Sequence, residues 1–325
     1  MSTQPLNIVF LDRDTIAPHI RLRDPAFPHT LQVYDRTALA DVSQRIQNAD
    51  IVITNKVQLD AQAIAQANQL KLIAVAATGV DNIDIQACNQ HQVSIANIRD
   101  YARHSVPEHA FSLIFALRRS ITAYRESVRQ GRWQQAQQFC YFDYPIEDLH
   151  ASTIGIVGRG VLGKATAQIA QALGMRVLFA ARKGQTNVTA PYTEFTQVLA
   201  ESDVISLHCP LTPETQNLLS WNEFEQMQRR PLIINTARGG LVDNAALAKA
   251  LERQQIAGAG IDVATPEPPS NNHLLMQLLR YPNFILTPHI GWASTQAMQT
   301  LADQLIDNIE AFVAGQPRHI VNPNS

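Results

Sequence analysis

Short apolar runs alternate with helix-like stretches along the first hundred residues of the chain. The apolar runs are almost continuous, as expected for strands that are buried on both faces. Between them, apolar residues recur at helical spacing, and Asp60 is placed to cap one of these helices. The predicted strands are 6–11, 51–54, 72–76 and 93–96, and the predicted helices are 37–47 and 60–69. This alternation favours a parallel α/β sheet.

The same alternation restarts at Ser152. Between the two series, Ser105–Gln130 has the pattern of one long helix with Pro107 in its first turn, where proline is tolerated. The aromatic stretch 131–150 predicts an irregular loop over the domain junction. The second series predicts strands at 153–157, 176–181, 203–208, 231–235, 258–262 and 284–287, then a helix over 294–314. The predicted fold class is α/β, with two doubly wound parallel-sheet domains.

A glycine-rich turn follows the first strand of the second series. It reads Gly158-x-Gly160-x-x-Gly163, with Val161 and Leu162 between the last two glycines, and a helix follows. The first glycine permits a sharp turn, the second permits close approach of a pyrophosphate, and the third permits tight packing of helix on sheet. The N–H groups at the start of the helix then face the phosphates. The stretch predicts a dinucleotide site; the alternative is a tight turn that binds nothing.

Composition narrows the classes of partner. The chain has 325 residues and a formal net charge of −2, with acids and bases interspersed, so neither nucleic acid nor an anionic membrane is an expected partner. No apolar run approaches the roughly 20 residues that span a bilayer. The three cysteines, Cys88, Cys140 and Cys209, are far apart and form no CxxC pair. We therefore expect no disulfide framework, no metal site and a reducing cytoplasmic location.

Two cations follow the second strand of the nucleotide unit. An NAD site usually has an acidic residue about 20 residues past the glycines, which bonds the ribose 2′-hydroxyl. The corresponding position here is Ala181, and Arg182 and Lys183 come next. These cations would attract a 2′-phosphate, so the sequence favours NADP over NAD. The alternative is that Arg182 stacks on adenine and Lys183 is solvated.

Three chemically capable side chains follow other strands of this series. Arg238 can hold a carboxylate, His289 can exchange a proton near neutral pH, and Glu267 can orient an imidazole. Asp262 lies at the end of the strand before Glu267. Taken singly, the three have plain alternatives as a surface cation, a core histidine and a loop acid. Together, at strand ends beside a dinucleotide loop, they indicate a catalytic set.

These stretches resemble the D-isomer-specific 2-hydroxyacid dehydrogenase family, and most of all its hydroxypyruvate/glyoxylate reductase (glycerate dehydrogenase) branch. The resemblance runs from about Leu72 to Ser294 and includes the glycine turn. The other matching stretches are Ala77-Thr-Gly-Val-Asp-Asn-Ile-Asp84, Ser105-Val-Pro-Glu-His109, Pro210-Leu-Thr-Pro-Glu-Thr215, Asn235-Thr-Ala-Arg-Gly-Gly240, Asp262–Pro269 and Pro288-His-Ile-Gly-Trp-Ala-Ser294.

The resemblance implies a role for each matching residue. Arg238 would bind the substrate carboxylate and polarise the keto oxygen, His289 would be the proton donor in reduction, and Glu267 would orient His289 and keep it protonated. Asp262 would lie by the nicotinamide carboxamide. The further residues implied for the substrate are Thr78, Gly79, Val80 and Trp292, and those implied for the cofactor, beside the glycine turn and the two cations, are Val106, Cys209, Pro210, Thr215, Thr236 and Ala237.

The resemblance also implies architecture and activity. A Rossmann-type nucleotide domain, 101–291, would be inserted into a flavodoxin-like substrate domain, 1–100 plus 292–325, and the chain would form a homodimer. The activity would be reduction of hydroxypyruvate to D-glycerate and of glyoxylate to glycolate with NAD(P)H. Three alternatives stay open: reduction of a larger 2-keto acid, oxidation of a phosphonate or phosphite, and a non-enzymatic protein that senses dinucleotides.

Overall fold

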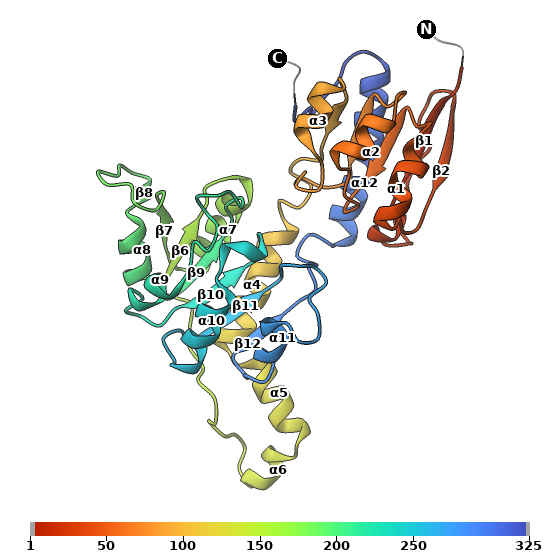
Figure 1. Ribbon diagram of the computed structural model, residues 1–325. Helices are drawn as coiled ribbons and strands as arrows, with labels where there is room; N and C mark the ends of the chain where they lie inside the picture. The colour runs from red at the N-terminus through yellow and green to blue at the C-terminus, as the bar shows by residue number, and fades with distance from the viewer. Residues whose placement is uncertain (1–3, 323–325) are drawn as a thin grey trace. The chain divides into compact units, whose positions relative to one another are not determined.

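The computed structural model describes residues 4–322 and divides the chain into two units (Figure 1). Ala102–Ala293 form one unit, here called unit 2. The chain before it, up to Tyr101, and the chain after it, from Ser294, form the other, unit 1.

Unit 1 is a doubly wound parallel sheet with the order β2-β1-β3-β4-β5. Side chains that alternate along its strands point to opposite faces. Val9, Val52 and Ile73 share one core with α1, α2 and α3, whereas α12 packs on the sheet at β4. The strands are β1 Leu6–Phe10, β2 His29–Val33, β3 Ile51–Thr54, β4 Leu72–Val75 and β5 Ser94–Ala96, and the helices are α1 Val42–Ile46, α2 Ala61–Gln66, α3 Ile85–Gln90 and α12 Thr295–Val313.

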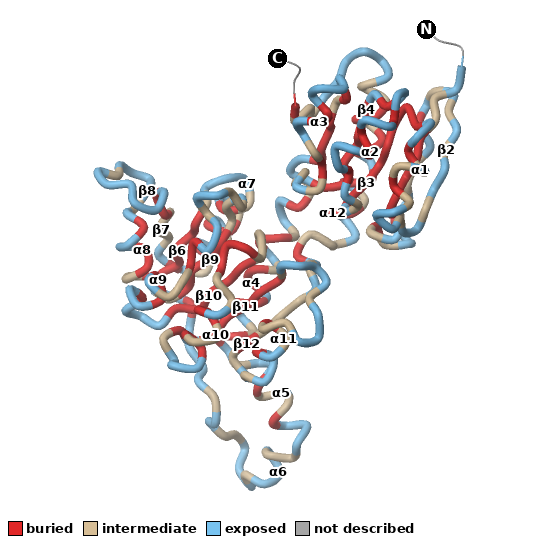
Figure 2. Tube along the Cα trace, viewed as in Figure 1, coloured by how far each residue is buried: buried red, intermediate tan, exposed pale blue. Residues whose placement is uncertain are grey.

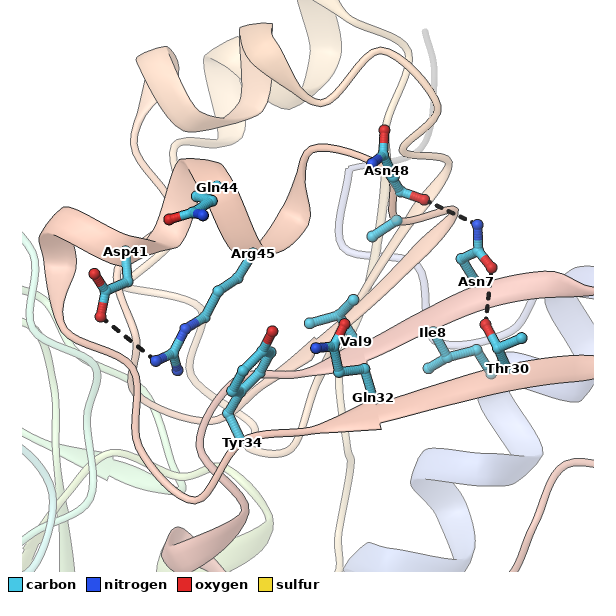
Figure 3. A pocket seen from close by; sticks show the side chains of 11 residues that line it. Asn7, Ile8, Val9, Thr30, Gln32, Tyr34, Asp41, Gln44, Arg45 and Asn48 are labelled. Carbon is cyan, nitrogen blue, oxygen red and sulfur yellow. Dashed lines mark hydrogen bonds and ion pairs between the residues drawn. The ribbon is translucent and has the colours of Figure 1, made fainter.

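Strand β2 was not predicted, because it is an edge strand without an apolar run. Its sequence is His-Thr-Leu-Gln-Val, and it pairs only with β1. Beside it, a polar groove of about 440 Å³ lies between β2 and α1 (Figure 3). Arg45 stacks on Tyr34 there, 3.9 Å from the ring centre, and pairs with Asp41. The groove has neither histidine nor glycine turn, so it is not the candidate active site.

Unit 2 is a seven-stranded parallel sheet with the order β12-β11-β10-β9-β6-β7-β8. Its strand order reverses between β6 and β9, the topological switch point at which α/β sheets bind ligands. The strands are β6 Thr153–Val157, β7 Arg176–Ala180, β8 Tyr192–Thr193, β9 Val204–Leu207, β10 Leu232–Asn235, β11 Gly258–Ile261 and β12 Phe284–Leu286.

Helices cover both faces of this sheet. Helices α4 and α7 share one core with the strands, and α8, α9, α10 and α11 share the other. Figure 2 shows the central strands of both units as buried. The covering helices are α4 Ser105–Arg118, α7 Val161–Ala172, α8 Phe195–Glu201, α9 Trp221–Glu225, α10 Asn244–Glu252 and α11 Leu274–Leu278. The predicted class, two doubly wound parallel α/β domains, is confirmed.

The prediction of one helix over 105–130 is wrong. Helix α4 ends at Arg118, and Ser120 has a φ of 48°, a left-handed conformation that no α-helix continues through. A second helix, α5, begins at Ile121 and ends at Arg129. The stretch 131–150 was expected to be a loop, but it contains helix α6, Arg132–Ala136.

Helices α5 and α6 and the returning segment, residues 121–146, form an arm of unit 2 (Figure 1). Tyr124 is its centre: the rings of Tyr141 and Tyr144 lie 5.5 and 5.2 Å from its own, and its hydroxyl donates to the carbonyl of Tyr144. At the base of the arm, Arg118 pairs with Glu147. The arm is therefore ordered by its own contacts, although much of its surface is exposed (Figure 2).

Candidate active site

The three candidate catalytic side chains lie in unit 2, in loops after neighbouring strands. Arg238 follows β10, Glu267 follows β11 and His289 follows β12. These strands are adjacent and parallel in the sheet. Their carboxyl ends therefore meet at one edge, which is where α/β sheets bind ligands.

His289 and Glu267 form a hydrogen-bonded pair. The distance from Nδ1 to Glu267 Oε2 is 2.7 Å, and the two side chains are 25% and 32% exposed. The other carboxylate oxygen of Glu267 accepts from the backbone N–H of Ala264 at 2.9 Å. A carboxylate on Nδ1 fixes the proton there and leaves Nε2 for proton exchange. The pair is thus oriented as a general acid–base unit requires.

Asp262 anchors the turn that carries His289. Its carboxylate accepts from the backbone N–H groups of Ile290 at 3.0 Å and Gly291 at 2.8 Å, and from the Thr287 hydroxyl at 2.5 Å. His109 Nε2 lies 3.3 Å from the same carboxylate. Burial acts to raise the pKa of Asp262, but these hydrogen bonds outweigh it and lower the pKa below its ordinary value.

This anchoring explains how His289 keeps an unfavourable backbone conformation. Its φ is 54°, which costs a non-glycine residue free energy unless neighbouring contacts fix it. Asp262 holds Ile290 and Gly291, the two residues after His289. Trp292 Nε1 donates to the His289 carbonyl at 3.0 Å. Trp292, a predicted substrate residue, therefore also braces the turn of His289.

Asn235 holds the loop of Arg238. Its buried side chain donates to the Arg238 carbonyl at 2.9 Å and accepts from the Ala237 N–H at 3.0 Å. The Arg238 guanidinium donates to the Ala237 carbonyl at 2.9 Å. Asn235 thus fixes the backbone of Ala237 and Arg238 at the carboxyl end of β10.

The glycine turn joins β6 to α7 with the geometry of an anion site. Gly158 has a φ of 104°, and a Cβ there would lie 2.6 Å from the His208 carbonyl. A Cβ on Gly163 would collide with the carbonyl of Gly158, whereas the space beside Gly160 is open. No side chain caps α7 at Gly160, so the N–H groups of Val161, Leu162 and Gly163 are available to a ligand phosphate.

The other predicted cofactor residues lie at the carboxyl edge of unit 2 or in α4. Cys209 and Pro210 follow β9, and burial raises the pKa of the Cys209 thiol to about 11. The Thr215 hydroxyl donates to the Pro210 carbonyl at 2.8 Å, which closes this loop. Val106 is buried in the first turn of α4.

The buried hydroxyl of Thr236, at this edge of the sheet, favours a dinucleotide site. The hydroxyl of Thr236 is shut off from solvent and has no hydrogen-bond partner within residues 4–322. A buried hydroxyl normally has a partner, so this one fits a ligand atom. Together with the uncapped helix and the open space at Gly160, it shows that the residues present fit a dinucleotide.

Lys183, after β7, was expected either to attract a 2′-phosphate or to be solvated, and the structure shows a third arrangement. The position expected for an acid is Ala181, which is buried. Lys183 is not merely solvated: its Nζ lies 2.8 Å from the Glu223 carboxylate, whose side chain is 5% exposed. Glu223 also completes the cap of α9 with Ser220. Lys183 therefore has a structural partner, and Arg182 remains exposed.

Thr78, Gly79 and Val80, the predicted carboxylate-binding stretch, lie in unit 1 after β4. Two hydrogen bonds fix this loop. The Thr78 hydroxyl donates to the Ile98 carbonyl at 2.8 Å, and the Asn97 amide donates to the Thr78 carbonyl at 2.7 Å. The loop is thus held by the residues that follow β5.

Sequence reasoning did not assign roles to the residues that support the site. His109, Thr287 and Asn235 all lie within quoted motifs or next to them, yet their function is to hold other residues. His109 bonds Thr287 at 3.0 Å across 178 residues of sequence. Only the position of Asn235 at a strand end gave a sequence signal.

His208 makes the stability of unit 2 depend on pH. Its Nε2 bonds Ser206 and Thr166, its Nδ1 is enclosed without a partner among the described residues, and burial lowers its pKa from 6.5 to about 4. The unfolded chain thus binds a proton at a higher pH than the native state, so stability falls from pH 6.5 towards pH 4. We expect the His208 contribution to drop by about 2 kcal/mol between pH 7 and pH 5.

Urea unfolding of the wild type and of His208→Asn at both pH values measures this effect. Trp133, Trp221 and Trp292 all lie in unit 2, so tryptophan fluorescence reports on that unit. The variant should lose less stability on acidification than the wild type. An equal loss in both proteins would contradict the account.

Two classes of feature are absent from the described part of the chain. Within residues 4–322 no group of three or more histidine, cysteine, aspartate or glutamate side chains is arranged to hold a metal ion. In the same residues, no helix combines the length and apolar character needed to cross a membrane.

Comparison with known proteins places these features in a family. A model of the NAD binding domain of D-isomer specific 2-hydroxyacid dehydrogenases matches residues 111–291. The chain is 48% identical to a glycerate dehydrogenase of Methylorubrum extorquens, over 97% of this chain and 98% of that one. It is 36% identical to a hydroxypyruvate reductase of Blautia hydrogenotrophica, over 89% and 91% of the two chains.

A solved structure shows the same architecture. An acyclic imino acid reductase in complex with NADPH and D-Arg superposes with a TM-score of 0.81 at 26% identity, over 97% of this chain and all of that one.

Proposed function

Because the chain belongs to the D-isomer-specific 2-hydroxyacid dehydrogenase family, whose members are NAD(P)-dependent oxidoreductases, we propose that it reduces hydroxypyruvate to D-glycerate and glyoxylate to glycolate. The observation that carries this proposal is the His289–Glu267 pair, which lies at the same sheet edge as Arg238 and the glycine turn. A histidine acid, an arginine for the carboxylate and a dinucleotide loop are the groups that reduction of a 2-keto acid needs.

The proposed mechanism assigns one task to each side chain. When bound, the reduced nicotinamide supplies the hydride that adds to the keto carbon. Arg238 holds the substrate carboxylate with two N–H groups and stabilises the charge that develops on the keto oxygen. Protonated His289 donates from Nε2 to that oxygen, which gives the hydroxy acid. Glu267 accepts the hydrogen bond from Nδ1 and stabilises the imidazolium before the transfer.

The remaining site residues are assigned to the substrate and the dinucleotide. Thr78, Gly79, Val80 and Trp292 are proposed substrate contacts. Asp262 is proposed beside the carboxamide, although its main visible task is to hold the turn of His289. NADP is proposed as the preferred dinucleotide, because Ala181 supplies no acid against a 2′-phosphate and Arg182 is an exposed cation beside it.

Initial rates with a panel of acids test the substrate assignment. Hydroxypyruvate and glyoxylate should be reduced faster than phenylpyruvate and a branched 2-keto acid, with either NADPH or NADH. Faster turnover of the larger acids would replace the substrate but keep the reaction class. Tight dinucleotide binding without turnover of any acid in the panel would favour the sensor alternative.

We also propose that the chain is a homodimer and that the arm forms the interface. Phe139 and Phe142, in the segment of the arm that follows α6, are 91% and 82% exposed, which is unusual for large aromatic side chains that no other protein surface covers. Aromatic residues of this kind contribute strongly to protein interfaces.

Replacing both phenylalanines by serine should dissociate the dimer. Light scattering after gel filtration should give twice the 36.0 kDa chain mass for the wild type and the single mass for the double variant. Leu39→Ser is the matched control, since Leu39 is an exposed apolar residue of unit 1. A double variant that keeps the dimer mass would show that the interface lies elsewhere.

A further inference from the structure

Three cations surround the end of β7, but they differ in their partners. Lys183 forms an ion pair with Glu223, so the carboxylate of Glu223 offsets the charge of Lys183. Glu223 also caps α9. The charge of Arg182 acts on Glu214, whose pKa is lowered chiefly by a hydrogen bond with Thr212 and to a smaller extent by that charge. Lys183 and Arg182 therefore both interact with a carboxylate of the protein itself.

Arg159 is the third cation, and it belongs to the glycine turn itself. It lies between Gly158 and Gly160 and is exposed. Its guanidinium carbon lies 5.3 Å from the ring centre of Phe179 on β7 and 5.9 Å from that of Tyr192 on β8. Within residues 4–322 no carboxylate forms an ion pair with it, which distinguishes it from Lys183.

Strand pairing places this guanidinium near the end of β7. Phe179 pairs with Ile156 of β6 on one side and with Tyr192 of β8 on the other. Strand β7 thus lies between β6 and β8 (Figure 1). Ala181, two residues after Phe179, is the position from which an acid would contact the ribose 2′-hydroxyl. Arg159 therefore reaches from the phosphate-binding turn to the strand end at which the adenosine ribose is recognised.

We infer that Arg159 is the residue that distinguishes a 2′-phosphate from a 2′-hydroxyl, together with Arg182, while Lys183 supports the strand end through Glu223. A guanidinium stacked on aromatic rings keeps its orientation and still presents N–H groups at its edge, the geometry that binds a phosphate. This inference rests on the proposed function, because it assumes that the dinucleotide binds at the glycine turn.

Calorimetric titration of the unliganded protein tests it without any turnover. The probes are 2′,5′-ADP, NADP⁺ and NAD⁺, and the variant is Arg159→Gln. We expect its affinity for 2′,5′-ADP and NADP⁺ to fall about tenfold or more, as loss of a charge-assisted contact predicts, and its affinity for NAD⁺ to change far less. Arg159→Lys should restore part of the loss, because it keeps the charge but not the planar fork.

Two further variants make the test specific. Arg176→Gln removes the same charge from the opposite end of β7, where Arg176 pairs with Glu201, and should leave the NADP⁺ to NAD⁺ affinity ratio unchanged. Lys183→Gln should change that ratio less than Arg159→Gln does. A larger effect of Lys183→Gln, or an equal loss of NAD⁺ and NADP⁺ affinity in Arg159→Gln, would overturn the inference.

The wild-type titration separates failure of this inference from failure of the proposed function. Binding of NAD⁺ without measurable binding of 2′,5′-ADP would overturn the role of Arg159 and leave the reductase proposal standing. Binding of none of the three probes would overturn the dinucleotide site and the proposed function with it.

Discussion

Replacing His289 by alanine lowers kcat for hydroxypyruvate reduction by about 10³-fold, the middle of the range for loss of a general acid, and leaves dinucleotide affinity unchanged. The reason is that the keto oxygen then receives no proton as charge builds on it. The fold is not expected to suffer, because the side chain is partly exposed and Asp262 holds the turn through backbone groups. Stopped-flow absorbance of NAD(P)H and a calorimetric titration measure the two quantities.

Two further variants serve as the comparison and the control for His289→Ala. Glu267→Gln keeps the size of the partner but removes its charge, and it should lower kcat by less than His289→Ala does. His91→Ala removes an exposed histidine of unit 1 and should leave kcat unchanged. Turnover of His289→Ala at a rate near that of the wild type would remove His289 from the mechanism.

Replacing Arg238 by glutamine should lower kcat/KM by roughly 10²- to 10⁴-fold, because carboxylate binding and stabilisation of the keto oxygen are lost together. Arg238→Lys should recover only part of this loss, since an ammonium cannot form the two parallel hydrogen bonds of a guanidinium. Steady-state kinetics of both variants with hydroxypyruvate measure the effect. The charge-matched control is Arg280→Gln, because Arg280 is an exposed arginine beside Tyr281.

A substrate without the carboxylate identifies the group that Arg238 binds. Glycolaldehyde resembles hydroxypyruvate but lacks that group, so its slow reduction should be affected much less by Arg238→Gln. The losses from removing the arginine and from removing the carboxylate should therefore not add. Additive losses would show that Arg238 acts on something other than the carboxylate.

The sequence predicted the elements that are buried on both sides. Strands β6 and β10 have almost continuous apolar runs because helices cover both faces of their sheet, and their positions agree with the prediction. The edge strands β2 and β8 were missed because exposed strands need no such run. The break between α4 and α5 was missed because it depends on the left-handed backbone of Ser120. No glycine or asparagine, the residues that usually adopt this conformation, stands at that position.

The candidate catalytic residues could be named because each stands in a short motif at a strand end. Their surroundings could not. The contact of His109 with Thr287, and that of Lys183 with Glu223, depend on how distant segments pack. The consequence for Lys183 is specific: a cation expected to bind a phosphate forms an ion pair with Glu223, a residue of the α9 cap, and nothing in the local sequence pattern indicates that partner.

The most direct test of the account is the stoichiometry and configuration of the product. The protein is incubated with hydroxypyruvate and NADPH, and the glycerate formed is resolved by chiral chromatography. One D-glycerate is expected for each NADPH consumed, and about 10³-fold less glycerate from His289→Ala in the same time. Formation of L-glycerate, or no glycerate although NADPH binds, would contradict it.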